Sequence, residues 1–168
     1  MNTSDLLTMT AETNVMTPDS LLKHWQGHRS LTRKTIEAFP EDKLFTYSIG
    51  GMRPFAALVY EFLGMAVPGV TGVATGIWQK WADAKEVHTK KELLELWDHA
   101  TTELDRIWET IPSHRFAEQD TAFGQWPGTC ISFVFYFIDN EIHHRGQGYV
   151  YLRSLGIEPP AFWDRVGL

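Results

Sequence analysis

The stretch between residues 129 and 155 is the feature that most limits the folds open to this chain. Two sets of positions in it recur at spacings of three, four and seven, which is the repeat of an α-helix. One set is Phe133, Phe137, Asn140, His144, Tyr151 and Leu155, and the other is Ile131, Phe135, Ile138, Ile142, Tyr149 and Leu152. A helix that is apolar on two sides lies in the centre of a protein. We therefore expect a long, buried helix here, ended by Gly156 and the two prolines that follow.

Asn140 and His144 are polar residues on the first of these faces, one turn apart. Burying either of them without a partner would cost roughly 1–3 kcal/mol. Each therefore needs a neighbouring side chain, a water molecule, a metal ion or a ligand. His143 differs from them because it falls on the remaining, polar side of the helix.

Three further amphipathic segments precede this helix and are separated by proline and glycine. The four expected helices cover residues 17–39, 53–66, 90–111 and 129–155. The second is expected to end by Pro68 and Gly69, because both residue types interrupt helices. We expect connections without strands between the helices, since no strand-like alternation or hairpin signal competes. The sequence thus predicts an all-α fold, a four-helix bundle around one core.

Size, charge and cysteine content narrow the class of protein. With 168 residues, the chain is expected to form one domain over residues 17–168, after a loose extension over residues 1–16. A net charge of −6, with no run of lysine or arginine, argues against nucleic-acid binding. The single cysteine, Cys130, excludes an internal disulfide and is expected to be a packed small residue. We see no signal peptide and no uninterrupted apolar run that would span a membrane, and therefore expect a cytoplasmic protein.

The segment from residue 143 to residue 160 carries a recognisable pattern. It contains residues 143–147 (HHRGQ), 151–153 (YLR) and 156–160 (GIEPP). This pattern resembles the DinB/YfiT-like superfamily, a set of four-helix bundles regarded as metalloenzymes. The resemblance covers most of residues 17–160, with Trp25 and Arg29 on the first expected helix. It implies the same four-helix fold that the helical periods predict.

The resemblance also implies a metal site. Members of the superfamily typically carry three histidine ligands, one on the second helix and two, a turn apart, on the fourth. His144 matches one ligand of the fourth helix, and Asn140 stands at the position of the other. The apolar spacing of the second helix places Glu61 at the remaining position, with Tyr60 as the alternative at an offset of one residue. The implied metal-site residues are therefore Glu61, Asn140 and His144.

This set is weaker than three histidines as a site for zinc or nickel. Carboxylate and imidazole groups bind divalent metals, whereas a neutral amide oxygen is a poor ligand for either ion. Two interpretations stay open: a metal site with an altered preference, and a polar cluster in which Glu61 is hydrogen-bonded to His144 and Asn140. Burial would raise the pKa of Glu61, and a charged His144 would lower it. His28, on the packed face of the first helix, is either a replacement ligand or a core histidine.

Two functions follow from the resemblance. The first is a divalent-metal-dependent thiol S-transferase or isomerase, in which the metal stabilises the thiolate of a small thiol. Arg145 would then bind an anionic group of the substrate; otherwise its spacing from Glu141 suits an ion pair across one helical turn. The second is a non-catalytic, dimeric bundle that has lost the metal and has a ligand-binding, structural or stress-associated role. The residues at positions 61 and 140 favour the second function, and whether the chain is an enzyme stays open.

Aromatic residues are frequent in the connections between the expected helices. They are Trp78, Trp81, Trp126, Phe162 and Trp163. Exposed aromatic clusters mark interfaces between proteins, and the resemblance points the same way. We therefore expect a homodimer.

Overall fold

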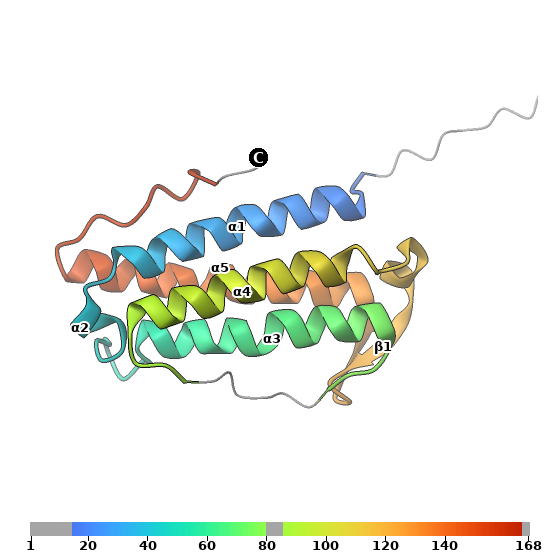
Figure 1. The fold of residues 1–168 in the computed structure, drawn as a ribbon, viewed down its shortest axis with the longest axis horizontal. Helices are drawn as coiled ribbons and strands as arrows, with labels where there is room; N and C mark the ends of the chain where they lie inside the picture. The colour runs from blue at the N-terminus through green and yellow to red at the C-terminus, as the bar shows by residue number, and fades with distance from the viewer. Residues whose placement is uncertain (1–14, 80–85, 166–168) are drawn as a thin grey trace, which may run out of the picture.

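The long helices of the protein lie side by side, as the ribbon drawing shows (Figure 1). The structure, a computed structural model, describes residues 15–79 and 86–165. The elements in this described part are α1 (Pro18–Ala38), α2 (Glu41–Leu44), α3 (Phe55–Thr75), α4 (Lys90–Trp108), the 3-10 helix η1 (Ser113–Ala117), β1 (Gln119–Ala122), β2 (Trp126–Thr129) and α5 (Cys130–Ser154). Helices α1 and α3 each pack against both α4 and α5. The expected helical bundle is confirmed in its main part, but the all-α, four-helix description omits α2, η1 and a small sheet.

The ends of three long helices follow from local sequence signals. Thr17 caps α1 by accepting a hydrogen bond from the Ser20 backbone, and Thr89 caps α4 in the same way. Helix α5 ends before Gly156, which has a φ of 76° that glycine adopts without strain. These boundaries lie within a few residues of the predicted ones. The extension predicted for residues 1–16 falls almost wholly outside the described residues.

Helix α3 is longer than predicted. It continues to Thr75, so the expected end at Pro68 is wrong and Pro68 lies inside the helix. The connection that follows α3 therefore begins only at Gly76, whose φ of 71° ends the helix in the left-handed conformation. A proline removes one helical hydrogen bond, and packing must compensate for that loss.

Two glycines after Pro68 supply this packing. A Cβ atom on Gly69 would lie 2.5 Å from the ring of Phe137, and one on Gly72 would lie 2.2 Å from the ring of Trp78. Both rings thus rest directly on the α3 backbone, which only glycine permits. The same residues that suggest a loop in the sequence are close-packing positions of a helix.

A short hairpin precedes α5, contrary to the expected connection without strands. Strands β1 and β2 pair antiparallel, with Ala122 opposite Trp126 next to the turn. The turn contains Phe123 and Gly124, with φ values of 52° and 72°. A positive φ is uncommon for a phenylalanine. Its ring lies 5.4 Å from Trp78 and 6.1 Å from Trp126, and these aromatic contacts stabilise the turn.

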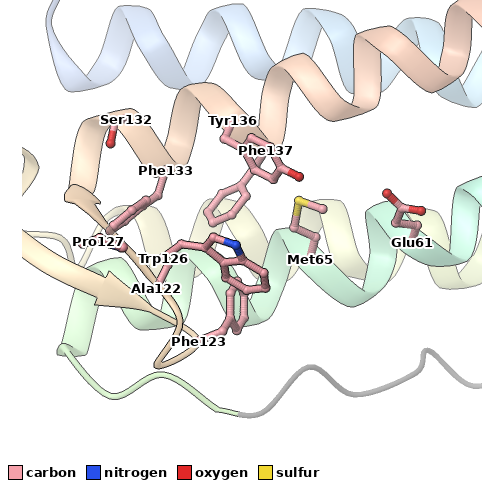
Figure 2. A pocket seen from close by; sticks show the side chains of 10 residues that line it. All are labelled: Glu61, Met65, Ala122, Phe123, Trp126, Pro127, Ser132, Phe133, Tyr136 and Phe137. Carbon is pink, nitrogen blue, oxygen red and sulfur yellow. The ribbon is translucent and has the colours of Figure 1, made fainter.

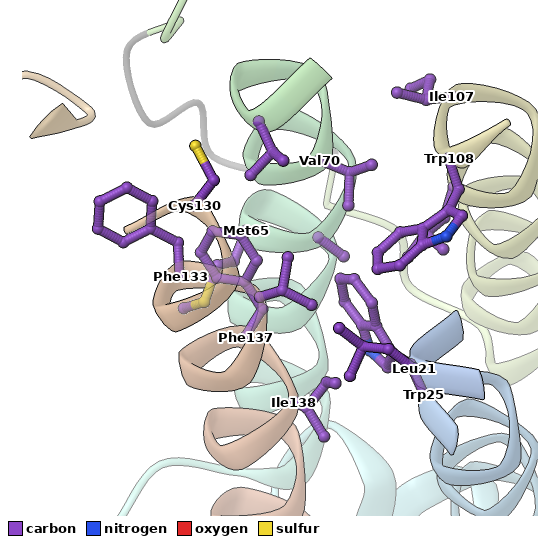
Figure 3. Packing of buried hydrophobic residues seen from close by; sticks show 14 of the residues in the cluster. Leu21, Trp25, Met65, Val70, Ile107, Trp108, Cys130, Phe133, Phe137 and Ile138 are labelled. Carbon is purple, nitrogen blue, oxygen red and sulfur yellow. The ribbon is translucent and has the colours of Figure 1, made fainter. Parts of the chain in front are cut away.

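All four long helices contribute to the apolar core. Trp25 of α1 packs edge-on against Trp108 of α4, and Phe137 of α5 lies on its other side (Figure 3). Met65 of α3 belongs to the same cluster. Cys130 lies there too; burial raises the pKa of its thiol, in agreement with the expected packed residue.

The second apolar face predicted for α5 is confirmed only in part, at the buried Ile138 and Leu152 and the partly buried Ile131 and Ile142. The buried residues of this helix outside the first face include Val134, Ile138, Glu141, Arg145 and Leu152. Phe135, which was assigned to that face, is 37% exposed. The buried face is therefore rotated and includes two charged residues that the apolar pattern did not select.

Helix α3 is long and apolar enough to cross a membrane by length and composition alone, which the sequence analysis did not expect. However, 67% of its apolar window is buried inside the bundle. That burial is typical of the core helix of a globular protein, and it accounts for the composition. The cytoplasmic location stays a prediction.

Candidate functional site

Three polar side chains, one from α3 and two from α5, meet between these two helices. Asn140 Nδ2 donates a hydrogen bond to Glu61 Oε1 over 2.9 Å, and His144 Nε2 lies 3.2 Å from the same oxygen. The side chains of Glu61 and His144 are only 19% and 14% exposed. The packing of α5 against α3 thus brings together the three residues that the sequence analysis selected.

Arg53 completes this cluster, and the sequence analysis did not single it out. Its Nη2 atom lies 2.5 Å from Glu61 Oε2. Burial raises the pKa of Glu61, but hydrogen bonds from Asn140 and Arg53 outweigh burial and hold the pKa below its usual value. Glu61 is therefore an anion with partners on both oxygens. Arg53 precedes α3, so helical spacing could not reveal the pair.

Two buried atoms of the cluster have no hydrogen-bond partner within the described residues: His144 Nδ1 and Asn140 Oδ1. When His144 donates from Nε2 to Glu61, its Nδ1 atom carries a lone pair. Asn140 Oδ1 is also an acceptor. With this tautomer the cluster contains two solvent-shielded acceptors that no described residue satisfies.

Tyr60, the alternative position, faces a different part of the protein. Its hydroxyl donates to the Val87 carbonyl over 2.6 Å and accepts from the Val87 backbone N–H over 2.9 Å. It thus fastens the segment before α4 to α3. Glu61 is the residue of the pair that faces α5.

A cavity of about 360 Å³ extends from Glu61 between α3, α5 and the hairpin. Figure 2 shows Met65 on α3 between Glu61 and the aromatic rings of Trp126 and Phe137. Glu61 is the only charged side chain among the ten that line the cavity. The space is therefore mostly apolar and aromatic, with one polar end.

Another buried polar cluster lies between α1 and α5. Glu141 accepts hydrogen bonds from Thr32 Oγ1 over 2.5 Å and from Trp25 Nε1 over 3.3 Å. It also lies 3.8 Å from both the Arg29 and the Arg145 guanidinium groups. Glu141 is 2% exposed and Arg145 is 5% exposed, so their predicted pair exists but is buried.

Arg145 and His28 belong to this second cluster. Arg145 donates to the His28 carbonyl and to Thr32 Oγ1, and its Nη2 atom lies 3.0 Å from His28 Nδ1. Arg165 Nη1 lies 2.9 Å from the other ring nitrogen, Nε2. His28 is therefore a core histidine held by arginines, and Arg145 points toward α1.

The second cluster could have been found from the sequence. Glu141 and Arg145 share the helical spacing of Ile138 and Leu152, and Trp25 stands on the packed face of the first helix. Charged residues at core spacing on two helices predict a buried ion cluster. The apolar pattern selected Ile138 and Leu152 but passed over the two charged residues beside them.

Comparison with protein families decides the assignment. The profile of the DinB family matches residues 9–165, nearly the whole chain. The chain belongs to the DinB family. No curated protein sequence matches it, so the family is placed by its profile and its fold.

Solved structures with the DinB fold include two proteins from Bacillus. A DinB-like protein of Bacillus subtilis is 20% identical, with a TM-score of 0.72, and the alignment covers 86% of this chain and 99% of that one. A DinB-like protein of Bacillus cereus is 16% identical, with a TM-score of 0.70, over 85% and 95% of the chains. A mutant of a mycothiol-dependent maleylpyruvate isomerase is 12% identical, with a TM-score of 0.61, over 83% and 68%. At these identities the likeness establishes the fold alone.

The metal site that the sequence resemblance implies does not fit these residues. The free donors of the cluster are one imidazole nitrogen and one amide oxygen, whereas zinc takes at least three protein ligands. The Glu61 carboxylate is already paired with the cation of Arg53. Across residues 15–79 and 86–165, no group of three histidine, cysteine or acidic side chains is arranged to hold a metal.

Proposed function

We propose that this DinB-family protein binds a small, largely apolar molecule in the cavity beside Glu61, without a resident metal ion. The observation that carries the proposal is the cavity itself, about 360 Å³ in volume, with Glu61 as the single charged residue among the described residues that line it. Small-molecule sites are mostly apolar cavities of roughly 300–1,000 Å³ with a few polar groups that orient the ligand.

The polar end of the cavity favours a ligand that donates hydrogen bonds. This end is the Glu61 carboxylate, an acceptor that lines the cavity and is held from behind by Asn140 and His144. The charge of Glu61 is balanced by Arg53, so a neutral ligand fits better than a cation. A hydroxyl or amide group attached to an aromatic or aliphatic body meets both requirements.

Benzyl alcohol is a suitable probe because it combines an aromatic ring with a hydroxyl donor. We expect it to shift the NMR signal of the Met65 methyl group in a saturable titration. Trp126→Ala removes a wall of the cavity and should weaken binding about tenfold. Trp163→Ala is the matched control, because Trp163 is also exposed but does not line the cavity. Equal affinities for the two variants, or no saturable shift of Met65, would contradict the proposal.

The second candidate is a metal-dependent thiol S-transferase or isomerase with an altered metal site. It is favoured by the likeness to the fold of a mycothiol-dependent isomerase and by the free His144 Nδ1 atom. The shortage of donors argues against it. Under this candidate, Glu61, Asn140 and His144 would hold zinc or nickel and the cavity would take a small thiol.

Calorimetry with zinc and nickel separates the two candidates. We expect no binding by the wild-type protein. The double variant Asn140→His with Arg53→Gln should bind, because it supplies a second imidazole and releases the Glu61 carboxylate. Stoichiometric binding by the wild type that His144→Ala abolishes would favour the metal-dependent enzyme instead.

We also propose that the protein forms a homodimer. Trp126, Phe162 and Trp163 are each more than half exposed, and such aromatic side chains are enriched at interfaces. Trp78 gives no support because its ring packs against Phe133, and Trp81 lies outside the described residues. Sedimentation equilibrium at micromolar concentration should give the mass of a dimer, and a monomer mass would count against the proposal.

A further inference from the structure

A cavity separate from the Glu61 site lies between α1, α5 and the segment that follows α5. Its volume is about 300 Å³, and His28, Arg145 and Arg165 line it together with apolar side chains such as Ile142 and Phe162. The segment after α5 runs back along the bundle (Figure 1). It is fastened to α1 by a salt bridge of 2.7 Å between Lys34 and Asp164, next to Arg165.

A guanidinium donor faces each of the two ring nitrogens of His28, although a neutral imidazole can accept a hydrogen bond at only one of them. Guanidinium groups of Arg145 and Arg165 lie 3.0 Å and 2.9 Å from its two ring nitrogens. A neutral imidazole accepts at one nitrogen and donates from the other. Burial and the neighbouring arginines lower the pKa of His28 to about 3, so the ring is neutral. One guanidinium therefore faces an N–H group of the ring, so that two donors meet without an acceptor between them.

The charges around the cavity are also out of balance. Glu141 lies between two buried guanidinium groups, those of Arg29 and Arg145, and compensates only one of them. Within the described residues, Arg165 makes no salt bridge with a carboxylate, and its Nε atom is buried without a hydrogen-bond partner. A buried positive charge without compensation is costly, so the site favours an anion.

We propose that this cavity binds a small organic carboxylate through Arg165 and His28, with the apolar part of the ligand against Ile142 and Phe162. A carboxylate oxygen can accept from the arginine and from the ring N–H together, which removes the conflict between the two donors. The planar carboxylate matches the two parallel N–H groups of a guanidinium. The volume is at the lower end of small-molecule sites, which limits the ligand to a small acid.

This site is independent of the cavity beside Glu61, because the two cavities share no lining residue. It also gives Arg145 a role different from the one the sequence suggested. We infer that Arg145 is a positioning residue: it is the more buried of the two arginines, so we assign it as the donor to His28 Nδ1. The ring then carries its proton on Nε2, toward Arg165 and the ligand.

Benzoate is the probe, and the full-length protein is titrated with it by calorimetry at constant ionic strength. We expect one benzoate per chain and an affinity about tenfold lower in Arg165→Gln. Arg153→Gln is the matched control, since Arg153 is an exposed arginine of α5 that pairs with Glu158. Benzamide, which has the same shape without the charge, should bind at least about tenfold more weakly than benzoate.

A second variant keeps the test decisive if Arg165→Gln loosens the segment after α5. Phe162 is 66% exposed, so Phe162→Ala should fold normally. It should weaken benzoate and leave the weaker binding of acetate unchanged, because only benzoate reaches the apolar wall. Equal benzoate affinity in wild type and Arg165→Gln, equal affinity for benzamide and benzoate, or tighter binding of inorganic phosphate than of benzoate would each overturn the proposal.

Discussion

The side chain of Asn140 donates a hydrogen bond to Glu61 over 2.9 Å and thereby joins α5 to α3. An imidazole that binds a metal would present a lone pair at this place, whereas the amide presents an N–H group. The same carboxylate is paired with Arg53. In this protein an arginine and an amide thus satisfy both carboxylate oxygens of Glu61.

Glu61→Gln should remove an acid-sensitive part of the stability. Because the folded-state pKa of Glu61 is below its ordinary value of 4.5, the ionised residue stabilises the fold fully above about pH 4.5. This stabilisation is lost as the pH falls through the folded-state pKa. Urea unfolding should therefore show a steeper decline of the unfolding free energy below pH 4.5 in wild type than in Glu61→Gln. Parallel pH profiles would contradict the role of Glu61.

His144→Ala should lower the unfolding free energy by roughly 1–3 kcal/mol, because it removes a largely buried partner of Glu61 and a contact with Phe62. His143→Ala is the control. His143 is exposed, and within the described residues its contacts are with Gln147 and the ring of His144 on the same helix, so its loss should cost less than about 0.5 kcal/mol. Equal costs in urea unfolding would mean that the Glu61 cluster adds no stability.

Glu141→Gln should lower the unfolding free energy more than Glu61→Gln or His144→Ala does. It leaves the buried guanidinium groups of Arg29 and Arg145 without their carboxylate, and breaking a buried ion pair costs about 3–5 kcal/mol. Glu158→Gln, at an exposed carboxylate, should cost less than about 0.5 kcal/mol. Thermal unfolding followed by circular dichroism measures both, and a small effect at Glu141 would show that water reaches the cluster.

Two glycine-to-alanine changes should have opposite signs. Gly69→Ala places a Cβ atom 2.5 Å from the Phe137 ring and should destabilise by about 1–3 kcal/mol. Gly146→Ala, in α5 with nothing within 4 Å of the new atom, should stabilise by about 0.5–1 kcal/mol through helix propensity. If Gly69→Ala also stabilised the protein, Gly69 would not be a close-packing position of α3.

The parts of the fold that were predictable depend on local signals. Thr89 with Glu92 and the glycine at position 156 set helix ends that the structure confirms. The end of α3 was not predictable in the same way, because the effect of Pro68 is offset by Phe137, a residue far away in the sequence. The hairpin was missed because its turn depends on Phe123 in a conformation that this residue type rarely adopts.

The candidate site, too, was predictable only where local sequence signals place its residues. Helical spacing places Asn140 and His144 on one face, and the family pattern adds Glu61; the structure brings the three together. Their role in metal binding stays a prediction. Arg53 could not be inferred, because its position depends on the path of the chain before α3. The contacts of Arg145 with α1 depend on which face of α5 turns toward that helix.

The pair of Arg53 and Glu61 also bears on the order in which the chain assembles. These residues are only eight positions apart, whereas the hydrogen bond from Asn140 to Glu61 spans 79 positions. Contacts between near neighbours in sequence form faster than distant ones, because less loop entropy is lost. When α5 docks, it therefore meets a carboxylate that already has its counter-ion. Burial of a bare charge, the step that would otherwise slow folding at this place, is avoided.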